Sequence, residues 1–452
     1  MKRKVFFFFT LALLLSVTTA SLAETMQLNL EEAIGLGLKN STTLKQKLLA
    51  VNAARAAVQA AKASYYPSVD LSATYLHLFK NEKTQDITFK GYTFPGSYST
   101  SSDPVSISAD LSQTIYTFGT LKSSVKIAEE NLTLVEMELE EEKRDLIVKI
   151  KRAFYWYTLA GEVLRVQEET LNYKEEALNV ARKRYDAGLV PDYEVLSAES
   201  DVENFKPSVI SAANQLKYAL LAVKDLLGVE DERDFDVELI SELGVEYYEF
   251  DREELFALAR RVKYEIGQYE RNINLAALGA EITKNGKKPV VDGFVGYEVQ
   301  SGFDPQTGKP RYWGEDSWEG NLSAGVRIQM PLSALFPWSK ENADIVQSKL
   351  DLEQLRMGLD SLESGVRMNV DNVLLRLEEE KSKILSGEKG VELALRLYDS
   401  TKKRYENGMA SNMELRDSQV SLNSAQLGYL KAMYDYNLAL FDLMDAVGVE
   451  HF

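Results

Sequence analysis

Apolar residues recur every three or four positions over two very long stretches of the chain, Leu121–Tyr185 and Leu352–Tyr405. Such spacing places the apolar side chains on one face of a helix, as in a coiled coil. Both stretches contain an extra four-residue step, ending at Ile150 in the first and at Val370 in the second, which locally unwinds a left-handed supercoil. About 65 helical residues extend roughly 100 Å. The pattern predicts two long coiled-coil helices, and an ordinary coiled-coil scaffold would account for it equally well.

The hydrophobic period changes to two in four other segments, which predicts β-strands. They form two hairpins, at residues 67–116 and 290–330, with strands of roughly 10–12 residues that are long enough to cross a bilayer when tilted. In the first strand the polar side consists of Ser68, Asp70, Ser72 and Thr74. The connections at about 80–102 and 301–317 are long and polar, as in the external loops of outer-membrane barrels. A soluble sandwich fits the alternation as well, but four strands leave two open edges and a small core.

Closing such a sheet requires other chains. Open edges are not tolerated in lipid, so the four strands would have to combine with those of further copies. Two chains would give eight strands, and three would give twelve and leave a lumen. Cyclic symmetry permits either number, and the sequence does not choose between them.

The chain consists of two copies of one unit. Arg184–Leu189 aligns with Arg404–Met409 at an offset of 220 residues. We expect a first repeat at 24–229, with a helix, the hairpin 67–116 and a long helical hairpin at 120–227. We expect a second repeat at 230–452, with a helix, the hairpin 290–330 and a helical hairpin at 340–447.

Shorter helices are expected beside the long ones. They cover about 30–63 and 193–227 in the first repeat, and 253–283 and 413–447 in the second. Pro207 should kink or break its helix, whereas its counterpart Leu427 should not. Two short helices placed end to end nearly equal one long helix, so a wall alternating the two kinds is geometrically possible.

Composition excludes several classes of function. The 452 residues are 45% hydrophobic, which is too apolar for a disordered protein, and carry a net charge of −17. Such a chain repels phosphate, so no nucleic-acid partner is expected. There is no cysteine, and there are two histidines, His77 and His451. We expect no metal site and no cofactor, and the absence of a nucleophile–base set argues against an enzyme.

The N-terminus predicts a secretory signal peptide at residues 1–23. Basic residues at positions 2–4 precede an apolar stretch, and Ser21 and Ala23 occupy the −3 and −1 positions of a cleavage site before Glu24. Export leaves a periplasmic or secreted protein, or an outer-membrane barrel.

Motifs in the order in which they occur along the chain resemble those of the TolC-like outer-membrane efflux proteins. They are Leu30–Ala33, Tyr66–Val69, Gln113–Gly119, Met330–Leu332 and the two Arg-Tyr-x-x-Gly turns. The resemblance covers essentially the mature length. It implies a homotrimer in which four strands per protomer form a 12-stranded transmembrane barrel, above a long helical barrel of mainly α structure. It also implies outer-membrane localisation with a large periplasmic part, a periplasmic adaptor protein and an inner-membrane pump.

The same resemblance assigns candidate gate residues at the periplasmic end. Glu414 and Asp417 match two acids that ring the constriction, and they are three apart on one helical face. Tyr405 and Glu194 match a pair that ties the second turn to the first repeat. A basic residue that locks the family's gate would fall at Ala410, where it is missing.

The adaptor-docking tips implied by the resemblance are the two turns. They comprise Gly188 with Leu189 and Gly408 with Met409. The expected function is a gated exit duct for efflux or type I secretion. The alternative is a coiled-coil structural protein of the cell envelope without a pore.

Overall fold

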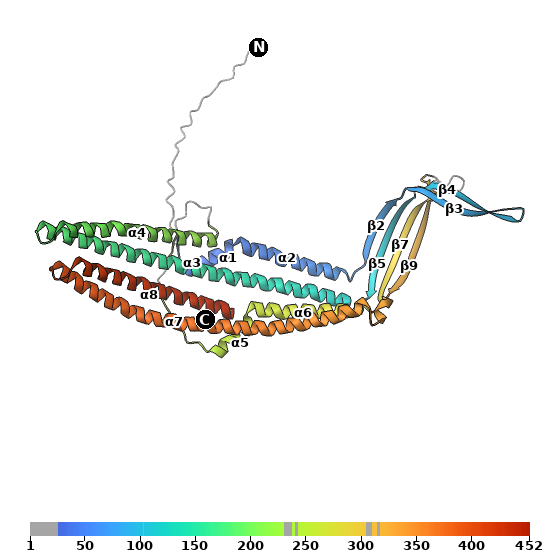
Figure 1. The fold of residues 1–452 in the computed structure, drawn as a ribbon. Helices are drawn as coiled ribbons and strands as arrows, with labels where there is room; N and C mark the ends of the chain where they lie inside the picture. The colour runs from blue at the N-terminus through green and yellow to red at the C-terminus, as the bar shows by residue number, and fades with distance from the viewer. Residues whose placement is uncertain (1–25, 103, 230–236, 240–242, 304–309, 314–316) are drawn as a thin grey trace, which may run out of the picture.

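The computed structural model describes residues 26–102, 104–229, 237–239, 243–303, 310–313 and 317–452. The predicted signal peptide at 1–23 lies outside the described residues. The molecule is elongated, with a long layer of helices and a β-sheet at one end (Figure 1). None of the described helices combines the length and the apolar character needed to cross a membrane.

The helices of the described residues fall into two sets of four with matching lengths. The first set is α1 (Leu30–Asn40), α2 (Thr42–Ala63), α3 (Thr120–Asp186) and α4 (Asp192–Leu227). The second set is α5 (Arg252–Val262), α6 (Tyr264–Asn285), α7 (Lys340–Glu406) and α8 (Asn412–Val447), with a 3₁₀ turn η1 (Leu332–Leu335) before α7. Both α3 and α7 have 67 residues, and both α4 and α8 have 36.

The core lies at the middle of the helical layer, where short helices and loops cover the long ones. Ile150 of α3 and Val370 of α7, the residues that end the extra four-residue steps, are fully buried there. One cluster joins α1, α3 and α4, and another joins α5, α7 and α8. Two short strands, β1 (Met26–Leu28) and β6 (Val237–Leu239), pair in parallel near the first cluster.

Each expected short N-terminal helix is divided in two. The first breaks at Ser41, whose backbone leaves the helical region while its hydroxyl accepts a hydrogen bond from the N–H of Leu44. Asn40 donates to the carbonyl oxygen of Leu227, which ties this break to the end of α4. The second break is at Lys263, whose ammonium donates to the carbonyl of Asp445 near the end of α8. Contacts distant in sequence fix both breaks, so helical periodicity did not reveal them.

Pro207 lies inside α4, which continues through it from Asp192 to Leu227. Of the two expected outcomes, a break is therefore wrong, and a kink stays a prediction. Pro207 is exposed, so its ring does not have to fit against a neighbouring helix. Proline removes one backbone hydrogen bond, and the remaining hydrogen bonds of the 36-residue helix keep α4 continuous.

The main sheet has the order β2-β5-β7-β9, with antiparallel pairing throughout. These strands are β2 (Ser68–Tyr75), β5 (Val105–Tyr116), β7 (Val290–Phe303) and β9 (Trp318–Gln329). The two-residue strand β8 (Pro310–Arg311) adds to one end of β7. Within the described chain no strand pairs with the outer edge of β2 or of β9. The four predicted strands are confirmed, with the predicted alternation.

The strand register places apolar side chains on one face of this sheet and polar side chains on the other. Val69, Leu111, Val295 and Ala324 are paired in one row across the four strands. The next apolar row is Leu71, Ala109, Tyr297 and Leu322. On the opposite face, one row is Ser72, Ser108, Glu298 and Asn321, and the hydroxyls of Ser72 and Ser108 lie 2.9 Å apart. The apolar face is exposed, with Leu71 79% accessible.

The connection expected as a loop at 80–102 is instead a β-hairpin. Strands β3 (Leu78–Phe89) and β4 (Tyr92–Ser102) pair in a two-stranded sheet of their own and extend away from the main sheet (Figure 1). Lys90 and Gly91 form its turn with positive φ angles of 49° and 83°. Such a turn matches the twist of the flanking strands. Its polar sequence lacks the apolar alternation by which the other strands were recognised.

Candidate functional site

Two glycine turns form the end of the molecule opposite the sheet. Gly188 joins α3 to α4 and Gly408 joins α7 to α8, with φ angles of 70° and 73°. The following N–H groups, of Leu189 and Met409, donate to the carbonyls of Arg184 and Arg404 at 2.9 and 2.7 Å. This bonding ends each long helix in a left-handed glycine, where any other residue would be strained. It leaves the Leu189 and Met409 side chains exposed at the tips.

Tyr405 and Glu194 meet through a third residue, Arg184. The Arg184 guanidinium lies 5.0 Å from the centre of the Tyr405 ring and 3.9 Å from a carboxylate oxygen of Glu194. Tyr405 is 1% exposed, and its hydroxyl has no hydrogen-bond partner among the described residues. Burial, and then the charge of Glu194, raise the pKa of this phenol. The two repeats are therefore joined here by a cation–π contact, while the ion pair of Arg184 with Glu194 lies within the first repeat.

Ala410 occupies the interior of the second tip. It is 8% exposed and belongs to an apolar cluster with Tyr398, Tyr405 and Leu415. A charged side chain at this position would have to leave that cluster. The positive charge near Tyr405 comes from α3, through Arg184, rather than from position 410.

Glu414 is held at the first turn of α8. Its carboxylate accepts from the backbone N–H of Ser411 at 2.7 Å, while the Ser411 hydroxyl accepts from the N–H of Glu414 at 3.2 Å. This reciprocal capping box satisfies two N–H groups at the helix start. The hydrogen bonds from Ser411 lower the pKa of Glu414, and the charge of Arg404, 3.5 Å away, lowers it further. Glu414 is therefore a fixed, ionised carboxylate at neutral pH.

Asp417 lies one turn further along α8 and is exposed. Between the two acids on the chain, Arg416 forms an ion pair at 3.2 Å with Asp201 of α4. Arg416 thus connects the second helical hairpin to the first. The Asp417 side chain makes no hydrogen bond or ion pair within the described part of the chain.

Polar contacts continue along the seam between the two helical hairpins. Asn423 donates to the Thr170 hydroxyl at 2.8 Å, and Gln419 donates to the Tyr173 carbonyl at 3.3 Å. The ring of Tyr173 lies 4.9 Å from that of Tyr398. These polar contacts lie beside apolar packing, in which Tyr173, Ala177 and Val180 of α3 lie against the buried cluster of the second tip.

Arg184 was missed as a site residue although it belongs to the repeated Arg-Tyr motif. Arg184 is the arginine of the first copy of this motif and Tyr405 is the tyrosine of the second copy, so both residues could be found from the repeat. What the sequence does not contain is the geometry, in which the arginine of the first copy lies on the tyrosine of the second. Arg416 was missed because its partner Asp201 is 215 positions away.

Comparison with known proteins identifies relatives along most of the chain. Residues 33–229 match the model of the family described as "Outer membrane efflux protein". The outer membrane efflux protein BepC of Brucella suis is 20% identical over 438 residues, which cover 97% of this chain and 89% of BepC.

Solved structures share the fold at low sequence identity. The CmeC outer membrane channel of Campylobacter jejuni matches with a TM-score of 0.73 and 16% identity, over 93% of this chain and 85% of that one. The open state of the MtrE outer membrane channel of Neisseria gonorrhoeae matches with a TM-score of 0.68 and 18% identity, over 93% and 89%. The mainly helical architecture with a four-stranded antiparallel sheet is therefore that of known outer membrane channels.

Proposed function

Since the chain belongs to the TolC-like family of outer membrane efflux proteins, we propose that it forms the gated exit duct of a tripartite efflux or type I secretion assembly. As a member of that family it is a transport channel of the outer membrane and not an enzyme. The proposal concerns the trimer, the gate and the partners.

The observation that carries the proposal is the four-stranded sheet with one exposed apolar face, one polar face and two unpaired edges. Three copies joined through β2 and β9 give a closed 12-stranded barrel with a lumen. Its apolar rows face lipid, and its polar rows, with Asp70, Asp110 and Glu298, face water. Exposed aromatic residues lie at both ends of the sheet, with Trp318 at the far end and Trp338 at the helical end, where bilayer interfaces would fall.

The helical tips form the gate in this proposal. Three copies bring six carboxylates, from Glu414 and Asp417, around the periplasmic opening. Ionised carboxylates close together attract cations and repel one another, so the opening prefers cations and resists closing further. The contact of Arg184 with Tyr405 holds each second hairpin against the first and keeps the opening narrow, and Glu194 of the first hairpin positions the guanidinium for it.

The exposed Leu189 and Met409 are the proposed contacts with the adaptor protein, through which an inner-membrane pump supplies energy. Replacing both by Glu should abolish export in cells while leaving conductance in bilayers unchanged. The matched control exchanges the two side chains, Leu189→Met with Met409→Leu, and retains apolar tips. Equal export by both variants would remove the tips from adaptor docking.

Single-channel recording in a planar bilayer tests the duct itself. Detergent-purified mature protein should give small, stable, cation-selective steps, as expected of a pore held mostly shut. A protein that purifies without detergent and gives no steps would instead be the non-pore envelope scaffold. That outcome would overturn the proposal.

A further inference from the structure

The polar face of the main sheet is acidic except at its helical end. Within the four strands β2, β5, β7 and β9, the one cation on this face is Arg327 of β9, directly opposite Asp292 of β7. The other carboxylates of this face lie in rows further from the helices: Asp70, Asp110, Glu298 and Glu319. The helical end of the polar face therefore differs in charge from the rest of it.

Arg327 and Asp292 do not form an ion pair, although opposite charges in this cross-strand position usually attract each other. Asp292 instead accepts a hydrogen bond from the hydroxyl of Thr114 at 2.9 Å. The guanidinium carbon of Arg327 lies 5.2 Å from the centre of the Phe294 ring. Among the described residues, the Arg327 side chain has no ion pair and no hydrogen bond, and it is exposed. Its N–H donors are therefore available to a ligand.

Gly325 provides the space for the ring on which Arg327 lies. Phe294 of β7 is directly opposite Gly325 of β9, and a Cβ at position 325 would come within 2.9 Å of the ring. A larger residue there would displace the ring and remove the support of the guanidinium. A guanidinium that lies on an aromatic ring keeps its planar set of N–H donors free to bind a carboxylate through two hydrogen bonds.

A cavity of about 660 Å³ lies beside this arginine, where the sheet meets the helical layer. Arg327, Phe294 and Asp292 line it together with other side chains of the polar face and with Ala60 and Ala63 near the end of α2. Cavities of roughly 300–1,000 Å³ are large enough to hold small organic ligands.

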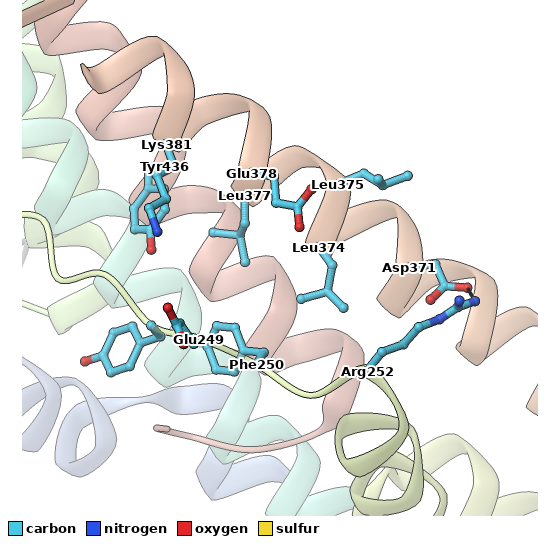
Figure 2. Close-up of a pocket in the computed structure, with 11 residues that line it drawn as sticks. Glu249, Phe250, Arg252, Asp371, Leu374, Leu375, Leu377, Glu378, Lys381 and Tyr436 are labelled. Atoms are coloured by element: carbon cyan, nitrogen blue, oxygen red, sulfur yellow. Dashed lines mark hydrogen bonds and ion pairs between the residues drawn. The ribbon is translucent and has the colours of Figure 1, made fainter. Parts of the chain in front are cut away.

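A second cavity of similar size shows what is different about the first. It has a volume of about 640 Å³ and lies beside α7 (Figure 2). In Figure 2 the guanidinium of Arg252 points to Asp371, and the two form an ion pair. The arginine of that cavity is therefore neutralised by the protein, whereas the arginine of the cavity at the sheet is not.

We propose that Arg327 binds the carboxylate of a small organic anion in the cavity at the helical end of the sheet. Phe294 and Gly325 position the guanidinium, and Thr114 holds Asp292 away from it by a hydrogen bond. In the proposed duct, three such sites surround the lumen where the helical barrel meets the β-barrel. The inference rests on the proposed function for this location, and it names Arg327 as a residue that determines which substrates the duct retains.

The remaining carboxylates of the polar face are too far away to oppose such a ligand strongly. The row of Asp70 and Asp110 continues to Ser323 of β9, four residues from Arg327. Four residues of a strand span about 13 Å. Exposed charges further apart than a Debye length of roughly 8 Å are largely screened at physiological ionic strength. Asp292 is therefore the carboxylate that matters, and its proton acceptor is already used by Thr114.

Binding of 4-fluorobenzoate to the detergent-purified protein tests the site, with broadening of the fluorine NMR signal as the readout. Arg327→Gln should raise the Kd at least about tenfold, because the charge-assisted hydrogen bonds are lost. The matched control is Arg356→Gln on α7, where an exposed arginine pairs with Glu353. The cation 4-fluorobenzylamine, which has the same ring, should not lose binding in Arg327→Gln. An equal Kd for benzoate in the wild type and Arg327→Gln would overturn the proposal.

A double variant tests whether Phe294 positions the arginine. Phe294→Leu removes the ring, so the guanidinium is free to pair with Asp292, and the Kd for 4-fluorobenzoate should rise about fivefold. Adding Asp292→Asn removes the competing carboxylate and should return the Kd to about the wild-type value. A purely structural role of Phe294 would leave both variants equally weak. That result would contradict the positioning by Phe294.

Single-channel recording of the same preparations separates this inference from the proposed function. Channel steps, together with binding that is lost in Arg327→Gln, support both. Channel steps with unchanged binding in Arg327→Gln overturn the anion site and leave the duct standing. Binding that depends on Arg327 without channel steps overturns the duct and leaves an anion site on the sheet. The absence of both overturns both.

Discussion

Arg184 of the first repeat lies on the buried ring of Tyr405 of the second, with 5.0 Å between the guanidinium carbon and the ring centre. The same guanidinium is 3.9 Å from a Glu194 oxygen, and its side chain is 17% exposed. One arginine therefore connects the end of α3, the start of α4 and the end of α7. In the proposed duct, the contact of Arg184 with Tyr405 must break when the second hairpin moves away from the first.

Arg184→Ala should favour the open gate. A largely desolvated cation–π contact contributes about 1 kcal/mol, which corresponds to roughly a fivefold rise in the open-to-closed ratio. Single-channel recording measures that ratio directly. The control is Arg182→Ala, because Arg182 is exposed and pairs with Glu199 within the first repeat. An open probability that changes equally in both variants would exclude the Tyr405 contact as the restraint.

Neutralising Glu414 and Asp417 should reduce cation preference and raise conductance. Glu414→Gln with Asp417→Asn removes charge while preserving side-chain size, and Gln still serves in the capping box. The reversal potential in a salt gradient should move toward zero. Glu353→Gln, an exposed substitution on α7 far from the tip, serves as the control. If selectivity is retained, the polar face of the barrel rather than the tip determines it.

Selectivity should persist to acid pH and depend on Ser411. Hydrogen bonds from Ser411 lower the pKa of Glu414, so its carboxylate stays charged as pH falls below the ordinary value of 4.5. The cap's contribution to stability is present above that value and is lost as pH falls through the lowered pKa. Ser411→Ala removes the hydroxyl but keeps the backbone N–H, so the midpoint of a selectivity titration should rise part of the way to the ordinary value. A midpoint that falls or stays constant would contradict this account.

Pro207→Ala should stabilise α4. Proline in an exposed helix interior costs about 3 kcal/mol relative to alanine, because it removes an N–H donor and crowds the preceding turn. Native-state hydrogen exchange of the α4 amides around Glu203 should slow by up to roughly a hundredfold. The matched control is Leu427→Pro at the counterpart in α8, where exchange should accelerate. Unchanged exchange in Pro207→Ala would mean that the helix has relaxed around the proline without cost.

The sequence predicted what depends on local periodicity. The long helices, the four strands and the glycine turns follow from apolar spacing and from the backbone preference of glycine, so Gly188 and Gly408 were found in their correct places. It did not predict what depends on distant partners. Ser41 and Lys263 break helices because of contacts with the ends of α4 and α8, and Arg184 acts on a ring 221 positions away. The β3–β4 hairpin was missed because its sequence is polar and lacks the alternation of apolar residues by which the other strands were predicted.

The two unpaired edges of the main sheet constrain how the protein reaches its membrane. β9 alone is 12 residues long, and every N–H on its outer side would lack a partner in lipid, at several kcal/mol each. In the proposed trimer a lone copy therefore does not insert, and its apolar face, including Leu71 and Leu322, stays in water until other copies arrive. Insertion becomes a step whose rate depends steeply on the concentration of newly exported chains. Until copies meet, these strands are exposed to aggregation through their open edges and apolar face.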